Sequence, residues 1–285
     1  MGKKIQPLND KKNLRFVIAL KIEAISFIKL YNLTIFNSSK SIFEIYNNLE
    51  LNIWLVISGV GNINSAAATI YLYDISMKTL KNIWINFGMA GCKNYEIGAV
   101  YNINKVTYNS GNRVESYYTS ALINNKLKSK ELISVEKPEI NFLNTQTLYD
   151  MEAYGFIKTV ERICTRELIC ITKIISDNQY EKPRNFIDNI NVYLELKLNE
   201  IKELINSYIE ISKKINNVTK SSLRLVEKKF HLTFYNKNVI SDLVSRIEII
   251  YSKKELENII REAETVESFI YNLRKKVKNF KMIIK

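Results

Sequence analysis

Three short apolar runs, at residues 15–20, 82–87 and 168–175, constrain the fold of this chain most strongly. Continuous apolar runs of this length are typical of strands that are covered on both faces of a sheet. Segments with helical patterns separate them, so strands and helices alternate along the chain. This alternation predicts an α/β fold with three layers, in which helices cover a central mixed sheet.

The remaining elements of this α/β region follow from shorter patterns. Further strands are expected at 41–46, 52–58, 98–108 and 131–135, and helices at 22–31, 63–73 and 151–163. Residues 109–130 are polar and carry no clear pattern. Gly59 and Gly61 follow one predicted strand, and Gly88 and Gly91 follow another. Glycine breaks after buried strands are typical of loops that approach a ligand closely.

Beyond Pro183 the pattern becomes helical throughout. Helices are expected at 186–215, 220–230, 238–250 and 253–280. We therefore predict an α/β domain over residues 1–215 and a helical extension over 216–285. The extension carries three apolar stripes at helical spacing, which must pack on one another, on the first domain or on a second subunit.

The net charge of +13, from 42 Lys and Arg against 29 Asp and Glu, raises the question of an anionic partner. The chain is also crowded with Lys, Asn, Ile and Tyr, as AT-rich coding favours, and this bias explains the charge more simply. The basic segment 274–278 is then a solvated helix end, and no nucleic-acid partner is expected. Without a membrane-length apolar run, a signal-peptide pattern or a disulfide framework, we expect a cytoplasmic protein and no membrane association.

Three acidic residues stand at the ends of apolar segments, where an α/β sheet places its ligand. Glu23 follows the first strand, Glu152 lies at the start of a helix, and Asp177 ends the last strand. Each alone is explained by a role at a helix start. Their occurrence together with the two glycine breaks favours a ligand site.

Five segments, in this order along residues 15–210, resemble the purine nucleosidase/nucleoside phosphorylase superfamily, and within it the methylthioadenosine/S-adenosylhomocysteine nucleosidases. The resemblance implies a nucleoside phosphorylase-like fold. The segments are Ala-Leu-Lys-Ile-Glu at 19–23, Ser-Gly-Val-Gly at 58–61, Asn-Phe-Gly-Met-Ala-Gly at 86–91, Asp-Met-Glu-Ala at 150–153 and Ile-Ser-Asp at 175–177.

The resemblance implies hydrolysis of the N-glycosidic bond of a purine nucleoside, expected to be a 5′-modified adenosine. Glu23 would deprotonate the attacking water, and Asp177 would protonate the base at N7. Glu152 would accept hydrogen bonds from the ribose hydroxyls. The other implied substrate-binding residues are Ser58, Gly59, Met89, Met151, Lys173 and Ser176. The resemblance implies no metal or cofactor, a small nucleoside as ligand and a homodimeric protein.

Two alternatives stay open. The first is a phosphorylase acting on a larger adenosyl conjugate, although Asn86 and Met89 stand where the superfamily's phosphorylases bind phosphate with Arg and Ser, and neither supplies a charged contact. The second is a degenerate, non-catalytic nucleoside-binding or interaction module. Lys173 replaces the Arg usual in the nucleosidases, and residues 108–148 form a shorter stretch than in that family. Residues 133–138 are candidates for part of the base contact.

Overall fold

The computed structural model describes residues 11–36, 41–76, 82–119, 123, 126–142, 144–251 and 253–278. The chain divides into two compact units, residues 1–209 and 210–285. The division lies a few residues before the boundary that we expected. In the part of the chain that the structure describes, no helix is long and apolar enough to span a membrane.

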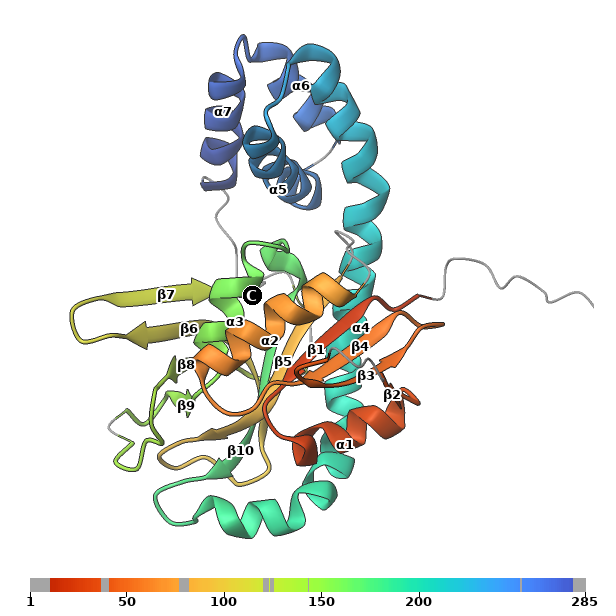
Figure 1. Ribbon diagram of the computed structural model, residues 1–285. Coiled ribbons are helices and arrows are strands. Elements are labelled where there is room, and N and C mark those ends of the chain that lie inside the picture. The colour runs from red at the N-terminus through yellow and green to blue at the C-terminus, as the bar shows by residue number, and fades with distance from the viewer. Residues whose placement is uncertain are drawn as a thin grey trace, which may run out of the picture. The chain divides into compact units, whose positions relative to one another are not determined.

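The first unit is built on a mixed sheet (Figure 1). β1, β4, β5 and β10 run parallel to one another, and β3 is antiparallel to β4. The strands are β1 (Leu14–Ile18), β2 (Thr34–Ile35), β3 (Glu44–Asn48), β4 (Ile53–Ile57), β5 (Ile83–Gly91), β6 (Val100–Asn109), β7 (Val114–Tyr118), β8 (Ser129–Ser134), β9 (Leu148–Asp150) and β10 (Ile169–Asp177). The order is β10-β6-β8-β9-β5-β1-β4-β3-β2, and β7 pairs with β6.

One part of this sheet closes on itself. β10 pairs with β5 as well as with β6, so that β5, β10, β6, β8 and β9 form a ring of paired strands. The expected α/β class with a mixed sheet is confirmed, but a flat three-layer sheet does not describe this closed part. Because the ring is closed, each of its five strands is paired on both sides and none forms a free edge within it.

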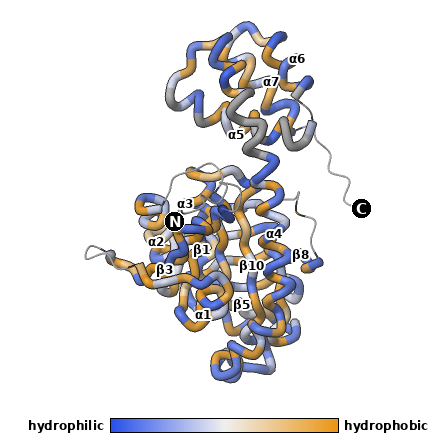
Figure 2. Tube along the Cα trace, turned by 90° about the vertical axis from the view of Figure 1, so that its right-hand side faces the viewer, coloured by the Kyte–Doolittle hydropathy of each residue, from blue (hydrophilic) through white to orange (hydrophobic). Residues whose placement is uncertain are grey.

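The strands at the centre of the sheet are mostly apolar and buried. Figure 2 shows β1, β5 and β10 as largely hydrophobic segments, and every residue of β1 is buried. The helices of this unit are α1 (Lys21–Leu30), α2 (Asn62–Ile75) and α3 (Ala153–Val160), with a 3₁₀ turn at Arg166–Leu168. The expected strands at 15–20, 82–87 and 168–175 and helices at 22–31 and 63–73 correspond to observed elements. The helix expected at 151–163 is shorter, and β9 precedes it.

α2 and α3 approach each other closely at Gly155. A Cβ atom at this position would lie 1.9 Å from the backbone oxygen of Asn62. The Asn62 side chain strengthens the contact, since its Oδ1 accepts hydrogen bonds from the Gly155 amide at 3.0 Å and from the Ser134 hydroxyl at 3.1 Å. Position 155 therefore requires glycine.

Gly155→Ala is expected to lower the free energy of unfolding by about 3 kcal/mol, the upper end of what overpacking a buried contact costs. The measurement is urea denaturation of the full chain. Ala67→Gly, on the same helix as Asn62, provides a control for the effect of glycine on helix propensity, which is about 1 kcal/mol. An unfolding free energy of the Gly155→Ala protein equal to that of the wild type would contradict the contact.

The second unit is helical and has a core of its own. α4 (Pro183–Lys229) enters it from the first unit, and α5 (Phe234–Ile250), α6 (Lys253–Glu262) and α7 (Val266–Lys278) complete it. The apolar stripes pack on one another, which is one of the three arrangements that we expected. The buried residues are Val226, Phe230, Ile240, Leu243, Val244, Ile247, Leu256, Ile259, Ile260, Ala263, Phe269 and Leu273.

Candidate active site

The first unit contains a cavity at the carboxyl ends of β1, β5 and β10. It includes about 610 Å³ of empty space, part of which is open to solvent. The cavity is lined by Ala19, Leu20, Glu23, Val60, Met89, Ala90, Gly91, Val135, Pro138, Glu139, Phe142, Tyr149, Asp150, Met151, Glu152, Ser176 and Asp177. Glu23, Glu152 and Asp177, which lie far apart in the sequence, therefore meet at one site.

Glu23 lies in the first turn of α1 and is 2% exposed. Its carboxylate accepts hydrogen bonds from two backbone amides, that of Met89 at 2.8 Å and that of Leu20 at 2.9 Å. Burial raises the pKa of Glu23 to about 7, although the two amides and the charge of Lys173 oppose the shift. A carboxyl with this pKa changes protonation state near neutrality, as a general base requires.

Glu152 lies in the bend between β9 and α3 and points into the same cavity. Its Oε1 accepts a hydrogen bond from the Gly61 amide at 2.9 Å, which ties the bend to the start of α2. Burial raises the pKa of Glu152, and the nearby Asp150 carboxylate adds to the shift. Met151, the neighbouring residue, also lines the cavity.

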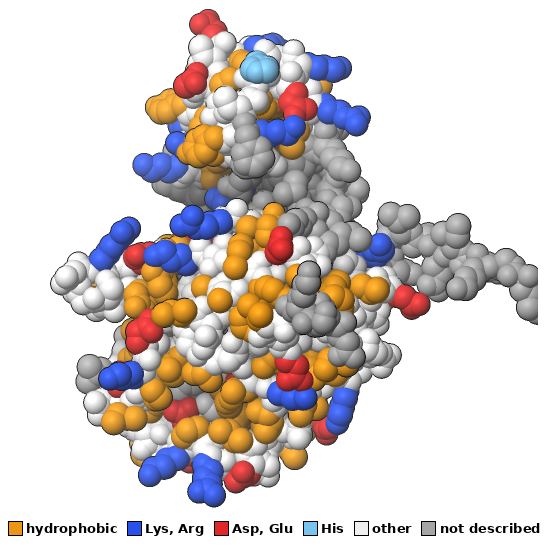
Figure 3. All heavy atoms as spheres, in the orientation of Figure 1, with side chains coloured by type: hydrophobic (Ala, Val, Ile, Leu, Met, Phe, Trp, Pro, Cys, Tyr) orange, Lys and Arg blue, Asp and Glu red, His pale blue; other side chains and the backbone are white. Residues whose placement is uncertain are grey.

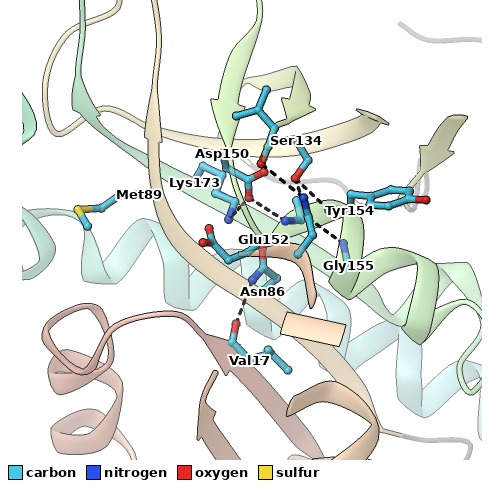
Figure 4. A network of polar contacts seen from close by, with 12 residues as sticks. Val17, Asn86, Met89, Ser134, Asp150, Glu152, Tyr154, Gly155 and Lys173 are labelled. Carbon is cyan, nitrogen blue, oxygen red and sulfur yellow. Dashed lines mark hydrogen bonds and ion pairs between the residues drawn. The ribbon is translucent and has the colours of Figure 1, made fainter. Parts of the chain in front are cut away.

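Behind Glu152 lies a buried ion pair, shown in Figure 4. Lys173 Nζ is 2.7 Å from Asp150 Oδ2, and both side chains are inaccessible to solvent. Lys173, expected to bind substrate, thus lies behind the cavity wall and is not among the lining residues. Asp150 was not singled out from the sequence, where its position beside Met151 and Glu152 was the available signal.

Lys173 and Glu23 face each other across Gly88. A Cβ atom at Gly88 would lie 3.3 Å from Glu23 Oε1 and 3.4 Å from Lys173 Nζ. Asn86, two residues earlier on the same strand, donates a hydrogen bond to the backbone oxygen of Val17 at 3.0 Å and so joins β5 to β1. The strand that forms the back of the site therefore leaves room at Gly88 for two charged side chains.

Asp177 ends β10 at the other side of the cavity. Its carboxylate accepts a hydrogen bond from the Ser176 hydroxyl, and burial raises its pKa. A Cβ atom at Gly91 would lie 2.7 Å from Asp177 Oδ2 and 2.8 Å from Phe142 Cε1. Gly91 therefore allows the carboxyl and the aromatic ring to share one corner of the cavity.

Phe142 was also missed in the sequence, since it lies outside every predicted helix and strand. Its ring is 3% exposed and packs against Tyr149 with a centroid distance of 5.8 Å. Its backbone has a φ of +40°, in the left-handed region. Of the segment 133–138, Val135 and Pro138 line the cavity. An aromatic ring beside Asp177 can stack on a planar base.

The remaining predicted residues divide between the lining and its surroundings. Met89 and Ser176 line the cavity. Ser58 and Gly59 follow β4 but are not lining residues, and the Ser58 hydroxyl donates to the backbone oxygen of Gly59 at 2.9 Å. Val60 contributes from this turn instead. The turn thus reaches the cavity one residue later than the sequence suggested.

Comparison with known proteins finds no family model that matches this chain and no similar curated protein. Solved structures do match. The apo 5′-methylthioadenosine nucleosidase of Arabidopsis thaliana superposes with a TM-score of 0.56 at 18% identity, over 68% of this chain and 95% of that one. A structure described as the MTA/SAH nucleosidase gives 0.53 at 16% identity, over 68% and 95%. The MTAN of Chlamydia trachomatis gives 0.50 at 21% identity, over 70% and 97%.

The part of this chain that superposes therefore shares its fold with these solved structures. The three solved structures are MTA or MTA/SAH nucleosidases. The likeness extends over nearly the full length of those chains.

Proposed function

We propose that this protein is a hydrolase that cleaves the N-glycosidic bond of a purine nucleoside, with a 5′-modified adenosine as substrate. One observation carries the proposal: Glu23, Glu152 and Asp177, three acids that follow three different strands, line a single cavity. The fold of known nucleosidases supports the same reaction class.

Cleavage of the bond between the ribose C1′ and N9 leaves positive charge on the sugar and negative charge on the base. Asp177 protonates the purine at N7 and makes it a better leaving group, which requires a carboxyl that holds its proton. Burial raises the pKa of Asp177 in this direction. The ring of Phe142 stacks on the base in the same corner.

Glu23 removes a proton from the attacking water. Its two amide contacts fix the carboxylate, and its pKa of about 7 makes it an effective base near neutrality. Glu152 accepts hydrogen bonds from the ribose hydroxyls, and Met151 packs against the sugar. The Asp150–Lys173 pair holds the strand end that carries Glu152. All carboxylates near the sugar stabilise the positive charge that develops there.

The experiment that tests the reaction class is direct. The purified full-length protein is incubated with methylthioadenosine, S-adenosylhomocysteine, adenosine and inosine, and released base is measured by chromatography. Release of free base supports the proposal. Binding of nucleosides without release would instead favour a non-catalytic nucleoside-binding module.

We expect base release to be independent of phosphate. The lining contributes no Lys, Arg or His side chain among the described residues, so phosphate finds no charge-assisted contact in the cavity. The rate with 50 mM phosphate should equal the rate in a phosphate-free buffer of the same ionic strength, and the sugar product should be free ribose or its 5′-derivative. A ribose 1-phosphate product would assign the protein to the phosphorylases.

We further propose that the protein acts in the cytoplasm as a homodimer, as its resemblance to the nucleosidases implies. The second unit is proposed to contribute to dimerisation or stability and to hold no catalytic residue. Sedimentation of the full chain and of residues 1–215 tests this role. A truncated protein that is soluble, dimeric and fully active would make the second unit an independent module.

A further inference from the structure

The cavity has an unusual charge for a protein with a net charge of +13. Five of its lining residues are acidic: Glu23, Glu139, Asp150, Glu152 and Asp177. None of the lining residues that the structure describes is basic. Figure 3 shows Lys and Arg side chains spread over the outside of the molecule on the face drawn. The positive charge of the chain is thus carried elsewhere.

Lys173, the cation behind the cavity wall, is already neutralised. Lys173 lies behind the wall, and its Nζ is 2.7 Å from the Asp150 carboxylate, with both side chains fully buried. A ligand cannot reach Nζ without displacing this carboxylate. Because separating a buried ion pair leaves an uncompensated charge, Lys173 is not available as an anion contact.

Four backbone donors around the cavity are also occupied. The start of a helix is normally an anion site, since its amides are free, but the Gly61 amide at the start of α2 donates to Glu152. The amides of Leu20 and Met89 both donate to Glu23. The Ala153 amide at the start of α3 donates to Asp150 Oδ2 at 2.9 Å. The protein's own carboxylates therefore fill each of these positions.

We propose that the cavity selects its ligand by charge: it accepts nucleosides whose substituents are neutral or cationic and excludes nucleosides that carry a phosphate. Asp177 holds its proton in the proposed reaction, but the other acids of the lining oppose a phosphate and the amides named above are occupied. A protonated amine meets acceptors instead. This inference rests on the proposed function, because it assumes a nucleoside as the ligand, and it specifies which nucleosides the site takes.

Glu139 offers a way to change the charge of the cavity without altering the acids assigned to the reaction. It is half-buried in the loop after β8, and its Oε1 accepts a hydrogen bond from the Asn141 amide at 2.8 Å. Glu50, exposed in the turn between β3 and β4, is a matched control. It precedes β4, whereas the cavity lies beyond the other end of that strand. Glu139→Lys and Glu50→Lys change the net charge equally.

The test compares adenosine, 5′-amino-5′-deoxyadenosine and adenosine 5′-monophosphate (AMP) with the full-length protein at pH 7. Adenine release gives kcat/KM for the first two, and AMP is measured as a competitive inhibitor. We expect the amine to react at least as efficiently as adenosine. We expect AMP to bind about 100-fold more weakly than adenosine. This ratio corresponds to a difference in binding free energy of roughly 2.8 kcal/mol, at 1.4 kcal/mol for each factor of ten. Salt should reduce this difference.

Glu139→Lys is expected to improve AMP binding relative to adenosine by about tenfold, the effect of one charge reversal at partial exposure, while Glu50→Lys leaves the ratio unchanged. AMP affinity within tenfold of that of adenosine in the wild type would overturn charge selection. So would equal ratios in the two variants. If no nucleoside releases adenine, the proposed hydrolysis fails, and calorimetric titration of the same three compounds still tests charge selection separately.

Discussion

Replacing Asp177 with asparagine is expected to reduce base release by about 10²–10⁴-fold, the usual contribution of a general acid. Asparagine keeps the size of the side chain and can still contact N7, but it has no acidic proton to give to the leaving base. The measurement is kcat/KM for release of adenine from the best substrate. Asp188→Asn, at an exposed position in α4, is the matched control and should retain wild-type activity.

A substrate with a good leaving group distinguishes loss of acid catalysis from loss of structure. In a nitrophenyl riboside, the leaving group departs as a stable nitrophenolate and does not need protonation. We therefore expect the Asp177→Asn enzyme to approach the wild-type rate with this substrate. Near-wild-type release of adenine by the variant would remove Asp177 from the mechanism.

Glu23→Gln is the second change with a large expected effect, a loss of about 10²–10⁴-fold in base release, because the amide cannot accept a proton from water. Glu23 must be ionised to act as a base, and burial raises its pKa to about 7. The wild-type rate should therefore fall as the pH decreases below about 7, where a growing fraction of Glu23 is protonated. The residual rate of the variant should not show this decrease below pH 7.

Glu50→Gln is the control for this substitution, and thermal unfolding of each protein shows whether the fold is retained. This comparison is needed because Glu23 accepts two amide hydrogen bonds and glutamine has one acceptor oxygen. If Glu23→Gln is folded, turns over at the wild-type rate and still loses activity below pH 7, another group activates the water.

Much of the first unit could be predicted because its central strands are buried on both faces and therefore read as continuous apolar runs. β7 and β9 were not predicted. β7 alternates between exposed and half-buried residues, and β9 has three residues, so neither produces a recognisable run. The closed ring depends on the pairing of β10 with both β5 and β6, which no local pattern records.

The helical region shows the same limit. The expected break near residues 216–219 does not occur, and α4 is continuous from Pro183 to Lys229. Asparagine lowers helix propensity only slightly, unlike glycine or proline, so Asn216 and Asn217 do not end the helix. The helix expected at 253–280 is divided instead, where Thr265 and Ser268 exchange hydrogen bonds between side chains and backbone amides at the start of α7.

For the site, the sequence located the three acids but not their surroundings. Glu23 and Asp177 were expected at strand ends, which converge at one edge of an α/β sheet. That Glu152 joins them was expected from the family resemblance, because the strand before it was not predicted. The pairing of Lys173 with Asp150 and the position of Phe142 could not be predicted. Both depend on contacts between segments that are distant along the chain.

The contact at Gly91 has a consequence for recognising active relatives of this protein. Exchange of this glycine for alanine, a change of one nucleotide, would force a methyl group against Asp177 and Phe142. An evolving lineage could thus disable the pocket and still retain every acid on which an inspection of catalytic residues would rely. In a comparison of descendants, glycine at this position is therefore as informative a marker of preserved chemistry as the acids themselves.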